Sequence, residues 1–184
     1  MRVLVTGGSG FVGQAVIRHL LAKHTIVGLS RRRTPTAHEF IQHDLSTPGI
    51  ATVAYSVEPC EVIVHAAARI DMNPFNAEVV ATNTVGTLNV AALAADWHAY
   101  VIYLSSIQVI GIPTEHPITE THPTHPFTTY HVTKLFGEYL FRATTPEFCT
   151  LRLTAPVGED MPLTRILPVF ARRAAAGETL RLAG

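Results

Sequence analysis

Cysteine is scarce in this chain of 184 residues, which contains only Cys60 and Cys149. Two cysteines so far apart form neither a disulfide framework nor a metal or redox motif, which fits a reducing compartment such as the cytoplasm. A long apolar run is also missing, and Arg2 leads directly into a short apolar segment. We therefore expect no membrane span and no signal peptide.

Net charge is absent as well, because 14 basic residues balance 14 acidic ones. A chain without excess positive charge is not expected to take nucleic acid or an anionic membrane as its main partner. Hydrophobic residues make up 47% of the sequence, which is typical of a folded globular protein and excludes a disordered one. The length suffices for one domain with a sizeable core.

Histidine, in contrast, is plentiful, and three histidines crowd one segment at His116, His122 and His125. Four prolines interrupt the same segment, which predicts an extended loop. A structural metal site needs ligands at fixed spacing on turns or helices. We therefore expect surface histidines here and no bound metal.

Short apolar runs alternate with helical patterns along the chain. Runs rich in Val, Ile and Leu suit strands that are buried on both faces of a parallel sheet. The alternation predicts an α/β fold, a doubly wound parallel sheet of the Rossmann type. The expected strands are 2–6, 25–29, 39–42, 62–65, 100–105 and 149–153, and the expected helices are 11–22, 76–95, 128–143 and 163–176, with a short helix or loop at 49–57.

The first strand is followed at once by a glycine-rich segment and then by a helical pattern. Strand, glycine turn and helix in this order form the phosphate-binding half of a dinucleotide site. Gly7 would permit the tight turn, Gly10 the close approach of pyrophosphate, and Gly13 the close packing of helix on strand. The N–H groups at the helix N-terminus would hold the anion.

Tyr130 and Lys134 lie four residues apart on a predicted helix, so their side chains share one face. A lysine cation near the phenol would lower the tyrosine pKa from about 10 toward neutrality. Tyr130 could then exchange a proton with a substrate hydroxyl. Ser106 ends the preceding strand and could hold the reacting oxygen, although Ser105 and Ser106 also suit a simple polar strand end.

Seven motifs occur in one order along nearly the whole chain, and together they resemble the extended short-chain dehydrogenase/reductase family, of the NAD(P)-dependent epimerase/dehydratase type. The matching segments are TGGSGFVG at 6–13, HDL at 43–45, VIVHAAA at 62–68, NTVGT at 83–87, SSIQVIG at 105–111, YHVTK at 130–134 and GE at 137–138.

The resemblance implies roles for individual residues. Ser106, Tyr130 and Lys134 match the catalytic residues, and Asn83 with Thr82 matches a supporting position for both the cofactor and the active site. The implied cofactor contacts are Gly7, Gly10, Phe11, Val12, Gly13, Ser30, Arg31, Arg32, Asp44, Leu45, Ala66, Ala67, Ala68, Thr82, Ser105, Tyr130, Lys134, Pro156 and Val157.

The end of the second expected strand departs from the family pattern. Members that prefer NAD carry an acidic residue where this chain has Ser30, followed here by Arg31, Arg32 and Arg33. Guanidinium groups bind phosphate bidentately, and no carboxylate would repel a ribose 2′-phosphate. We therefore expect NADP as cofactor, with NAD as the alternative, although a solvated basic loop would have the same sequence.

Ile107 and Gln108 stand where related 4,6-dehydratases carry an acidic pair, and neither can act as an acid or base near neutral pH. The resemblance therefore implies an oxidoreductase or epimerase that acts on a carbonyl/hydroxyl carbon of a sugar nucleotide or similar small molecule. Two alternatives stay open: an NADPH-linked ketone reductase resembling dihydroflavonol reductases, and a dinucleotide-binding sensor without catalysis.

Members of this family are longer than 184 residues and build most of the substrate site from their C-terminal part. Here Gly177–Gly184 reads as a turn entering a new strand. We expect one NAD(P)-binding domain over residues 1–184, with the C-terminal substrate-binding part mostly absent. Such a form should bind cofactor, turn over slowly and self-associate through an unfinished sheet edge, which would allow a homodimer.

Overall fold

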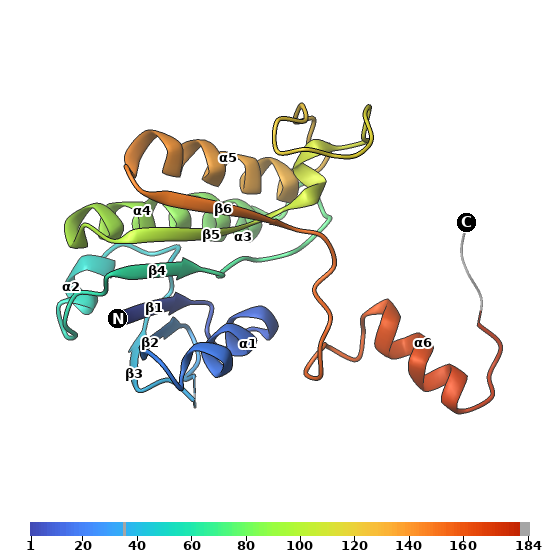
Figure 1. Ribbon diagram of the computed structural model, residues 1–184, viewed down its shortest axis with the longest axis horizontal. Coiled ribbons are helices and arrows are strands. Elements are labelled where there is room, and N and C mark those ends of the chain that lie inside the picture. Colours follow the sequence, from blue (N-terminus) through green and yellow to red (C-terminus); the bar gives the residue numbers. More distant parts are fainter. Residues whose placement is uncertain (35, 181–184) are drawn as a thin grey trace. The chain divides into compact units, whose positions relative to one another are not determined.

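The structure is a computed structural model that describes residues 1–34 and 36–180. The chain divides into two compact units, Met1–Thr154 and Ala155–Gly184 (Figure 1). The first unit holds β1 (Arg2–Thr6), α1 (Phe11–Leu20), β2 (Thr25–Ser30), β3 (Glu39–Gln42), α2 (Ile50–Ala54), β4 (Val62–His65), α3 (Ala77–Val80), the π-helical turn η1 (Ala81–Val85), α4 (Gly86–Trp97), β5 (Tyr100–Ser106), the 3-10 turn η2 (Ile107–Ile110), α5 (Thr129–Thr144) and β6 (Phe148–Leu153), and the second holds α6 (Ile166–Ala175).

The six strands form one parallel sheet in the order β3-β2-β1-β4-β5-β6. This order confirms the predicted α/β doubly wound sheet of the Rossmann type. The order turns at β1 and β4, whose carboxyl ends therefore flank a crevice of the kind in which such sheets bind ligands. Thr6 and His65 are the last residues of these two strands and lie side by side in the register.

Helices cover both faces of the sheet of the first unit (Figure 1). On one face α2, α4 and α5 pack on the larger core, which includes Leu4, Ile63, Tyr103 and Phe141. On the other face α1 packs through Ile17 against Val3, Val5 and Ile26. Alternate residues of each strand thus serve opposite faces, which explains why the strands read as continuous apolar runs.

The helix expected over 76–95 is present as a continuous helical run from Ala77 to Trp97, in which the π-helical turn η1 separates α3 from α4. Two threonine side chains donate hydrogen bonds to backbone carbonyls four residues earlier in the helix: Thr84 Oγ1 donates to Val80 O, and Thr87 Oγ1 donates to Asn83 O. Hydroxyl groups bonded to the carbonyl four residues back bend helices, and π-helical turns concentrate at functional sites.

Other boundaries differ by a few residues. Helix α1 ends at Leu20 and α6 begins at Ile166, while β2, β5 and β6 are each one residue longer than expected. The turn expected at Gly177 is present, with φ of 70°. Residues 178–180 form no strand, and 181–184 lie outside the described residues.

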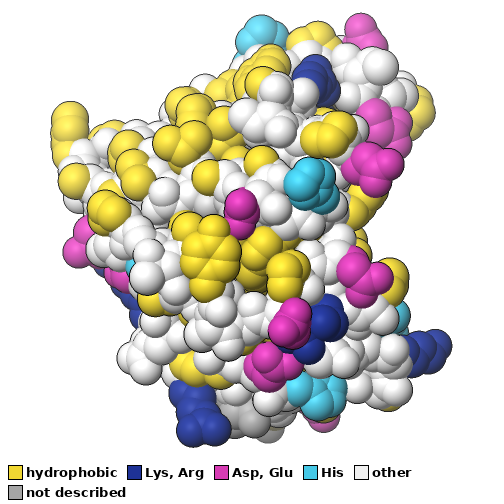
Figure 2. Space-filling view, turned by 90° about the vertical axis from the view of Figure 1, so that its left-hand side faces the viewer, with side chains coloured by type: hydrophobic (Ala, Val, Ile, Leu, Met, Phe, Trp, Pro, Cys, Tyr) yellow, Lys and Arg dark blue, Asp and Glu magenta, His cyan; other side chains and the backbone are white. Residues whose placement is uncertain are grey.

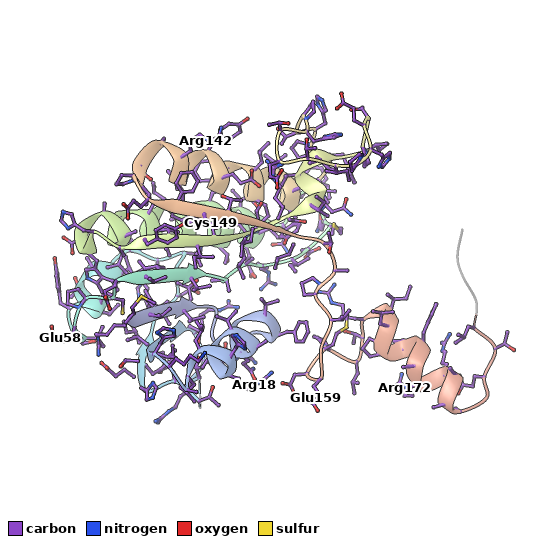
Figure 3. All side chains as sticks on the ribbon, viewed as in Figure 1. Arg18, Glu58, Arg142, Cys149, Glu159 and Arg172 are labelled. Carbon is purple, nitrogen blue, oxygen red and sulfur yellow. The ribbon has the colours of Figure 1, made fainter. Side chains whose placement is uncertain are left out.

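Both cysteines carry free thiols, Cys60 in the core and Cys149 half-buried on β6 (Figure 3). Burial raises the pKa of Cys60 to about 11, which makes it an unreactive packing residue. Within residues 1–34 and 36–180, no helix has the length and hydrophobicity needed to cross a membrane.

Candidate functional site

The glycine segment after β1 is shaped by contacts that only glycine permits. Gly7 has φ of 68° and donates its N–H to Leu29 O at 2.8 Å. A Cβ on Gly7 would lie 2.7 Å from Ala67 Cα, and a Cβ on Gly13 would lie 2.2 Å from Gly7 O. The turn therefore packs between α1 and the end of β4, as the roles expected for Gly7 and Gly13 require.

The start of α1 offers backbone donors to an anion. Gly10 caps the helix with no side-chain hydrogen bond, and no acidic residue occupies the first turn. The first N–H groups of a helix have no partner inside it, so those of Phe11, Val12 and Gly13 are available to a ligand. A Cβ on Gly10 would meet only Gly7 O, at 3.2 Å, which leaves the space beside Gly10 open.

The end of β2 is polar and carries no carboxylate. Ser30 is buried, and its hydroxyl donates to Arg32 O at 2.6 Å. Arg31 extends into solvent, with one guanidinium nitrogen 4.0 Å from Asp44 Oδ2. Ser30 therefore holds the turn that carries the arginines, while Arg31 remains exposed enough to meet a ligand.

Asp44 and Leu45 follow β3 and have different surroundings. Asp44 Oδ1 accepts bonds from the N–H and hydroxyl of Ser46, at 3.0 and 2.7 Å, and the hydroxyl bond holds the pKa of Asp44 below its usual value. Leu45 is buried in the core beneath Gly86. The structure thus gives the Leu45 side chain a packing role and leaves the half-exposed Asp44 as the polar group at this strand end.

The ends of β1 and β4 are joined through side chains. Ala67 N donates to Thr6 Oγ1 at 3.1 Å, and Ala66, Ala67 and Ala68 continue the chain along the glycine turn. Thr82 and Asn83 lie in η1. Asn83 is buried and clamps the loop after β4, since its Oδ1 accepts from Arg69 N at 2.8 Å and its Nδ2 donates to Arg69 O at 2.9 Å.

The two serines at the end of β5 are separated by their environments. Ser105 Oγ donates to Glu138 Oε1 at 2.6 Å, and Arg152 makes a bidentate ion pair with the same carboxylate. Ser106 Oγ accepts from Gln108 N at 3.3 Å and caps η2, against which α5 packs. The Ser105 hydroxyl is therefore bonded to a side chain of α5, whereas the Ser106 hydroxyl faces the backbone of η2.

Tyr130 and Lys134 lie on α5, and both are buried, Lys134 to 3% exposure. Lys134 Nζ sits 4.3 Å from the ring centroid of Tyr103. Burial lowers the pKa of Lys134 to about 7, and the Glu138 carboxylate opposes that shift. The Lys134 side chain thus lies against an aromatic face, and the charge of the Glu138 carboxylate, one turn along the helix, favours its protonated form against the effect of burial.

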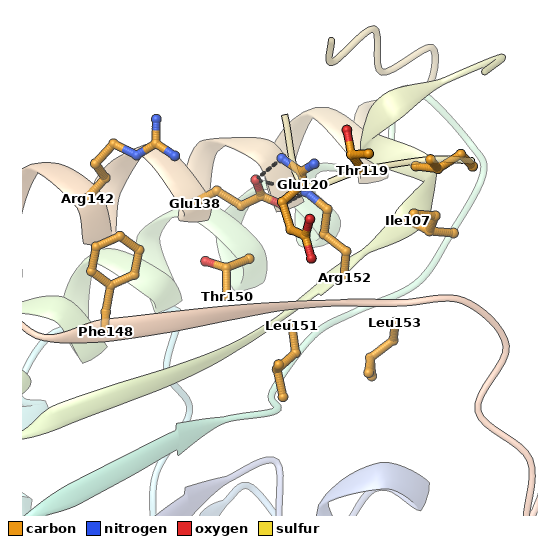
Figure 4. Close-up of a pocket in the computed structure, with 11 residues that line it drawn as sticks. Ile107, Thr119, Glu120, Glu138, Arg142, Phe148, Thr150, Leu151, Arg152 and Leu153 are labelled. Carbon is orange, nitrogen blue, oxygen red and sulfur yellow. Dashed lines mark hydrogen bonds and ion pairs between the residues drawn. The ribbon is translucent and has the colours of Figure 1, made fainter. Parts of the chain in front are cut away.

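A groove of about 630 Å³ lies beside β6 (Figure 4). Its walls include Ile107, Arg142, Phe148 and the Glu138–Arg152 ion pair. Ser106, Tyr130 and Lys134 do not line it. The groove is therefore separate from these three side chains, although Glu138, one turn from Lys134 on α5, lines it.

The histidine-rich loop is not uniformly exposed. His122 is buried and pins the loop, because its Nε2 accepts from Thr114 N at 3.1 Å while its Nδ1–H donates to Pro123 O at 2.8 Å. The expectation of a surface histidine is wrong for His122, whose ring replaces a backbone partner. Among residues 1–34 and 36–180, no group of histidines, cysteines and carboxylates could hold a metal.

Two more features bear on partners and on the last expected cofactor contacts. Figure 2 shows one face of the molecule, on which basic side chains are few and separated.

Pro156 and Val157 belong to the second unit, whose helix α6 contains no buried residue.

Sequence reasoning missed four buried polar residues that are linked with Asn83 by hydrogen bonds: Thr6, His65, Thr87 and Thr133. One signal was available in the sequence. His65 ends an otherwise apolar strand, and a polar residue in a buried strand needs hydrogen-bond partners.

The sequence of residues 3–184 matches the NAD dependent epimerase/dehydratase family. A UDP-glucose 4-epimerase of Mycolicibacterium smegmatis is 29% identical over the whole of this chain and 66% of its own length. The low-salt glycan biosynthesis protein Agl12 of Haloferax volcanii is 32% identical with the same coverage. The chain thus spans about two thirds of these relatives.

Among solved structures, the Bordetella bronchiseptica enzyme WbmG in complex with NAD is similar, with a TM-score of 0.87 and 29% identity over 98% of this chain and 61% of that one. The same enzyme in complex with NAD and UDP gives a TM-score of 0.86.

Proposed function

Since the chain belongs to the NAD-dependent epimerase/dehydratase family, we propose that it carries the dinucleotide site and the proton-transfer residues of an enzyme acting on a carbonyl/hydroxyl carbon of a sugar nucleotide. Relatives named as UDP-glucose 4-epimerase, and a similar enzyme crystallised with NAD and UDP, support the substrate class. The chain's coverage of those relatives leaves substrate, activity and partners as proposals for the whole protein.

The observation that carries the proposal is a glycine turn whose close contacts leave no room for a side chain at Gly7 or Gly13. A buried Tyr130 and Lys134 on α5 accompany it. The close contacts of Gly7 and Gly13 bring the turn, α1 and the end of β4 together and fit a pyrophosphate at the helix N-terminus. Gly10, Phe11 and Val12 would hold the phosphates, and Ala66 to Ala68 with Thr82 would flank the rest of the dinucleotide.

A bound nicotinamide ring would supply and accept hydride at the substrate carbon. Ser106 would donate a hydrogen bond to the substrate oxygen and hold it against Tyr130. Tyr130 would take the hydroxyl proton as hydride leaves the carbon and return it when hydride comes back. Lys134 would stabilise the phenolate with its buried charge, and Asn83 would hold the loop after β4 in place.

The cofactor form proposed from Ser30 is NADP, with NAD also accepted. Ser30 presents no carboxylate to repel a 2′-phosphate, and Arg31 is exposed beside it. The ion pair of Arg31 with Asp44 is long and solvated, so little free energy opposes its exchange for a phosphate contact. The similar WbmG enzyme was crystallised with NAD, which is why NAD is kept as the alternative cofactor.

Fluorescence titration of the 184-residue chain with NADH and NADPH tests the proposal. Saturable binding is expected, and Gly10→Val should abolish it because the branched side chain would fill the pyrophosphate position. Ala51→Val is the matched control, since Ala51 is exposed in the first turn of α2, far from the glycine turn. Equal binding by the parent chain and Gly10→Val would refute the site.

A further inference from the structure

His65 is a fully buried histidine whose two ring nitrogens both have partners. Its Nδ1 lies 2.7 Å from Thr6 Oγ1, and its Nε2 lies 3.0 Å from Thr87 Oγ1. Thr6 ends β1 directly before the glycine turn, and Thr87 lies in the first turn of α4. The ring of His65, at the end of β4, therefore bridges the end of β1 to the first turn of α4.

The neighbouring bonds fix which nitrogen carries the proton. Thr87 Oγ1 donates its single hydrogen to Asn83 O at 2.6 Å, so it can only accept from His65. Nε2 must therefore be protonated, and Nδ1 must accept. Thr6 Oγ1 then donates to Nδ1 while it accepts from Ala67 N at 3.1 Å. Every donor and acceptor around the ring is satisfied in this one arrangement.

The same chain of bonds continues to the helix of Tyr130. Asn83 Nδ2 donates to Thr133 Oγ1 at 3.0 Å, and Thr133 Oγ1 donates to Tyr130 O at 2.7 Å. Each side chain along this route, from Thr6 to Thr133, is at most 3% exposed. A network without solvent competition holds its members in fixed geometry. The end of β1 is thus tied to the first turn of α5.

The ring's surroundings also require it to be uncharged. His65 stacks on Tyr103 at 5.5 Å between ring centroids, and Lys134 Nζ lies over that same tyrosine ring. Burial first, and the Lys134 charge second, lower the pKa of His65 to about 3. A second cation here would compete with the Lys134 ammonium and would leave Nδ1–H facing the Thr6 hydroxyl proton.

We propose that His65 is a positioning residue: as the neutral Nε2–H tautomer, it joins the strand end that carries the dinucleotide turn to the helix that carries Tyr130 and Lys134. The functional meaning of this link rests on the proposed function, whereas the tautomer and the network do not. When a dinucleotide occupies the turn, the link transmits the resulting order to the first turn of α5.

Histidine nitrogen NMR tests the tautomer in the ligand-free chain. His65 should show the Nε2–H form without titration between pH 5 and 9, a window well above its pKa of about 3. His122 is an internal control with the opposite arrangement, because a carbonyl at Nδ1 and an N–H at Nε2 require the Nδ1–H form. His65→Gln and His122→Gln assign the two signals. An Nδ1–H signal for His65, or its titration in this window, would overturn the inference.

Amide hydrogen exchange with NADH as probe tests the link. In the parent chain, NADH should slow exchange both at the glycine turn and at His131–Lys134. In Thr87→Val, NADH should still slow exchange at the glycine turn. Its slowing of exchange at His131–Lys134 should be about tenfold weaker, which is the effect of one hydrogen bond on local opening. Thr87→Ser restores the hydroxyl and should restore the coupling. This pair leaves the His65 ring in place and changes a single hydroxyl group.

The two proposals fail in different ways in this experiment. Absence of any slowing at the glycine turn of the parent chain would contradict the proposed dinucleotide site. Slowing at the glycine turn with none at α5 in the parent chain, or equal slowing at α5 in Thr87→Val, would overturn the role of His65 while leaving the site intact.

Discussion

The glycine turn and the Tyr130–Lys134 end of α5 are built in opposite ways. The turn is a backbone site, in which glycines have hydrogen atoms where other residues have side chains and the neighbouring backbone of Ala67 approaches closely. The end of α5 is a side-chain site. The Lys134 amine depends on residues from other parts of the chain: it lies over the Tyr103 ring of β5, and the Glu138 carboxylate that raises its pKa is paired with Arg152 of β6.

The difference predicts how each region fails. A substitution in the turn should remove affinity for the dinucleotide, and catalysis is then lost because no cofactor is bound. A change around Lys134 should leave ligand affinity and alter proton transfer or stability, because buried charges depend on their partners. The buried network through His65 connects the two regions.

The largest expected effect separates chemistry from binding. Tyr130→Phe removes the proposed proton donor and acceptor, and the reduction of the bound cofactor by a sugar-nucleotide substrate, proposed for the whole protein, should slow by about 10²- to 10⁴-fold. Affinity for NADH should change little, because the glycine turn is untouched. Stopped-flow absorbance of the reduced nicotinamide measures the rate, and fluorescence titration measures the affinity. An unchanged rate would assign proton transfer to another group.

The ion pair behind Lys134 should matter next most. Glu138→Gln leaves the Arg152 guanidinium without its carboxylate and should cost about 3 kcal/mol of unfolding free energy. Urea unfolding measures the loss. Glu78→Gln breaks the exposed Arg69–Glu78 pair, 2.8 Å apart, and serves as the control. It should cost less than about 1 kcal/mol. Equal losses would show that burial of the pair is unimportant.

Cofactor form is tested at Ser30. A charge-assisted phosphate contact contributes roughly 1.5–3 kcal/mol, so NADPH should bind about ten to a hundred times more tightly than NADH. Ser30→Asp would place a carboxylate against the 2′-phosphate and reverse the preference. Ala51→Asp, at an exposed position in the first turn of α2, controls for added charge alone. Equal affinities of the parent chain for both cofactors would reject the NADP proposal.

A pH-dependent effect should follow from the titration of Lys134. Its pKa is about 7 in the folded chain and 10.5 as the ordinary value, so between these pH values the unfolded state binds more protons. The contribution of Lys134 to the free energy of unfolding therefore rises as pH increases from 7 toward 10.5. Lys134→Met should remove this rise, and Lys23→Met, at an exposed position, should not. Urea unfolding at several pH values is the measurement.

The strands and the glycine turn could be predicted from sequence because short-range patterns determine them. The bounds of β1, β3 and β4 agree with their apolar runs, and Gly7 has the positive φ that its motif implies. The break at Asn83 could not be predicted, because helix periodicity is retained while hydroxyl groups redirect the bonds.

The partners of the candidate site residues were beyond sequence reasoning for another reason. Thr6 and His65 are 59 residues apart, and Ser105 and Glu138 are 33 apart. Only the packed sheet brings such pairs together. The sequence therefore predicted a cofactor contact for Ser105 but not the bond of its hydroxyl to Glu138. Nor did it predict that His65 bridges Thr6 and Thr87.

The most direct test of the central claim is a nitrogen–proton NMR titration of the chain with NADH. The account predicts saturable shifts of the amides of Gly7, Gly10 and Gly13, together with those of Ala66 and Ala67, and smaller shifts at the first turn of α5. Thr119 and Thr150, in the groove beside β6, should not move. Shifts confined to that groove, or no saturable shift at the glycine turn, would contradict the account.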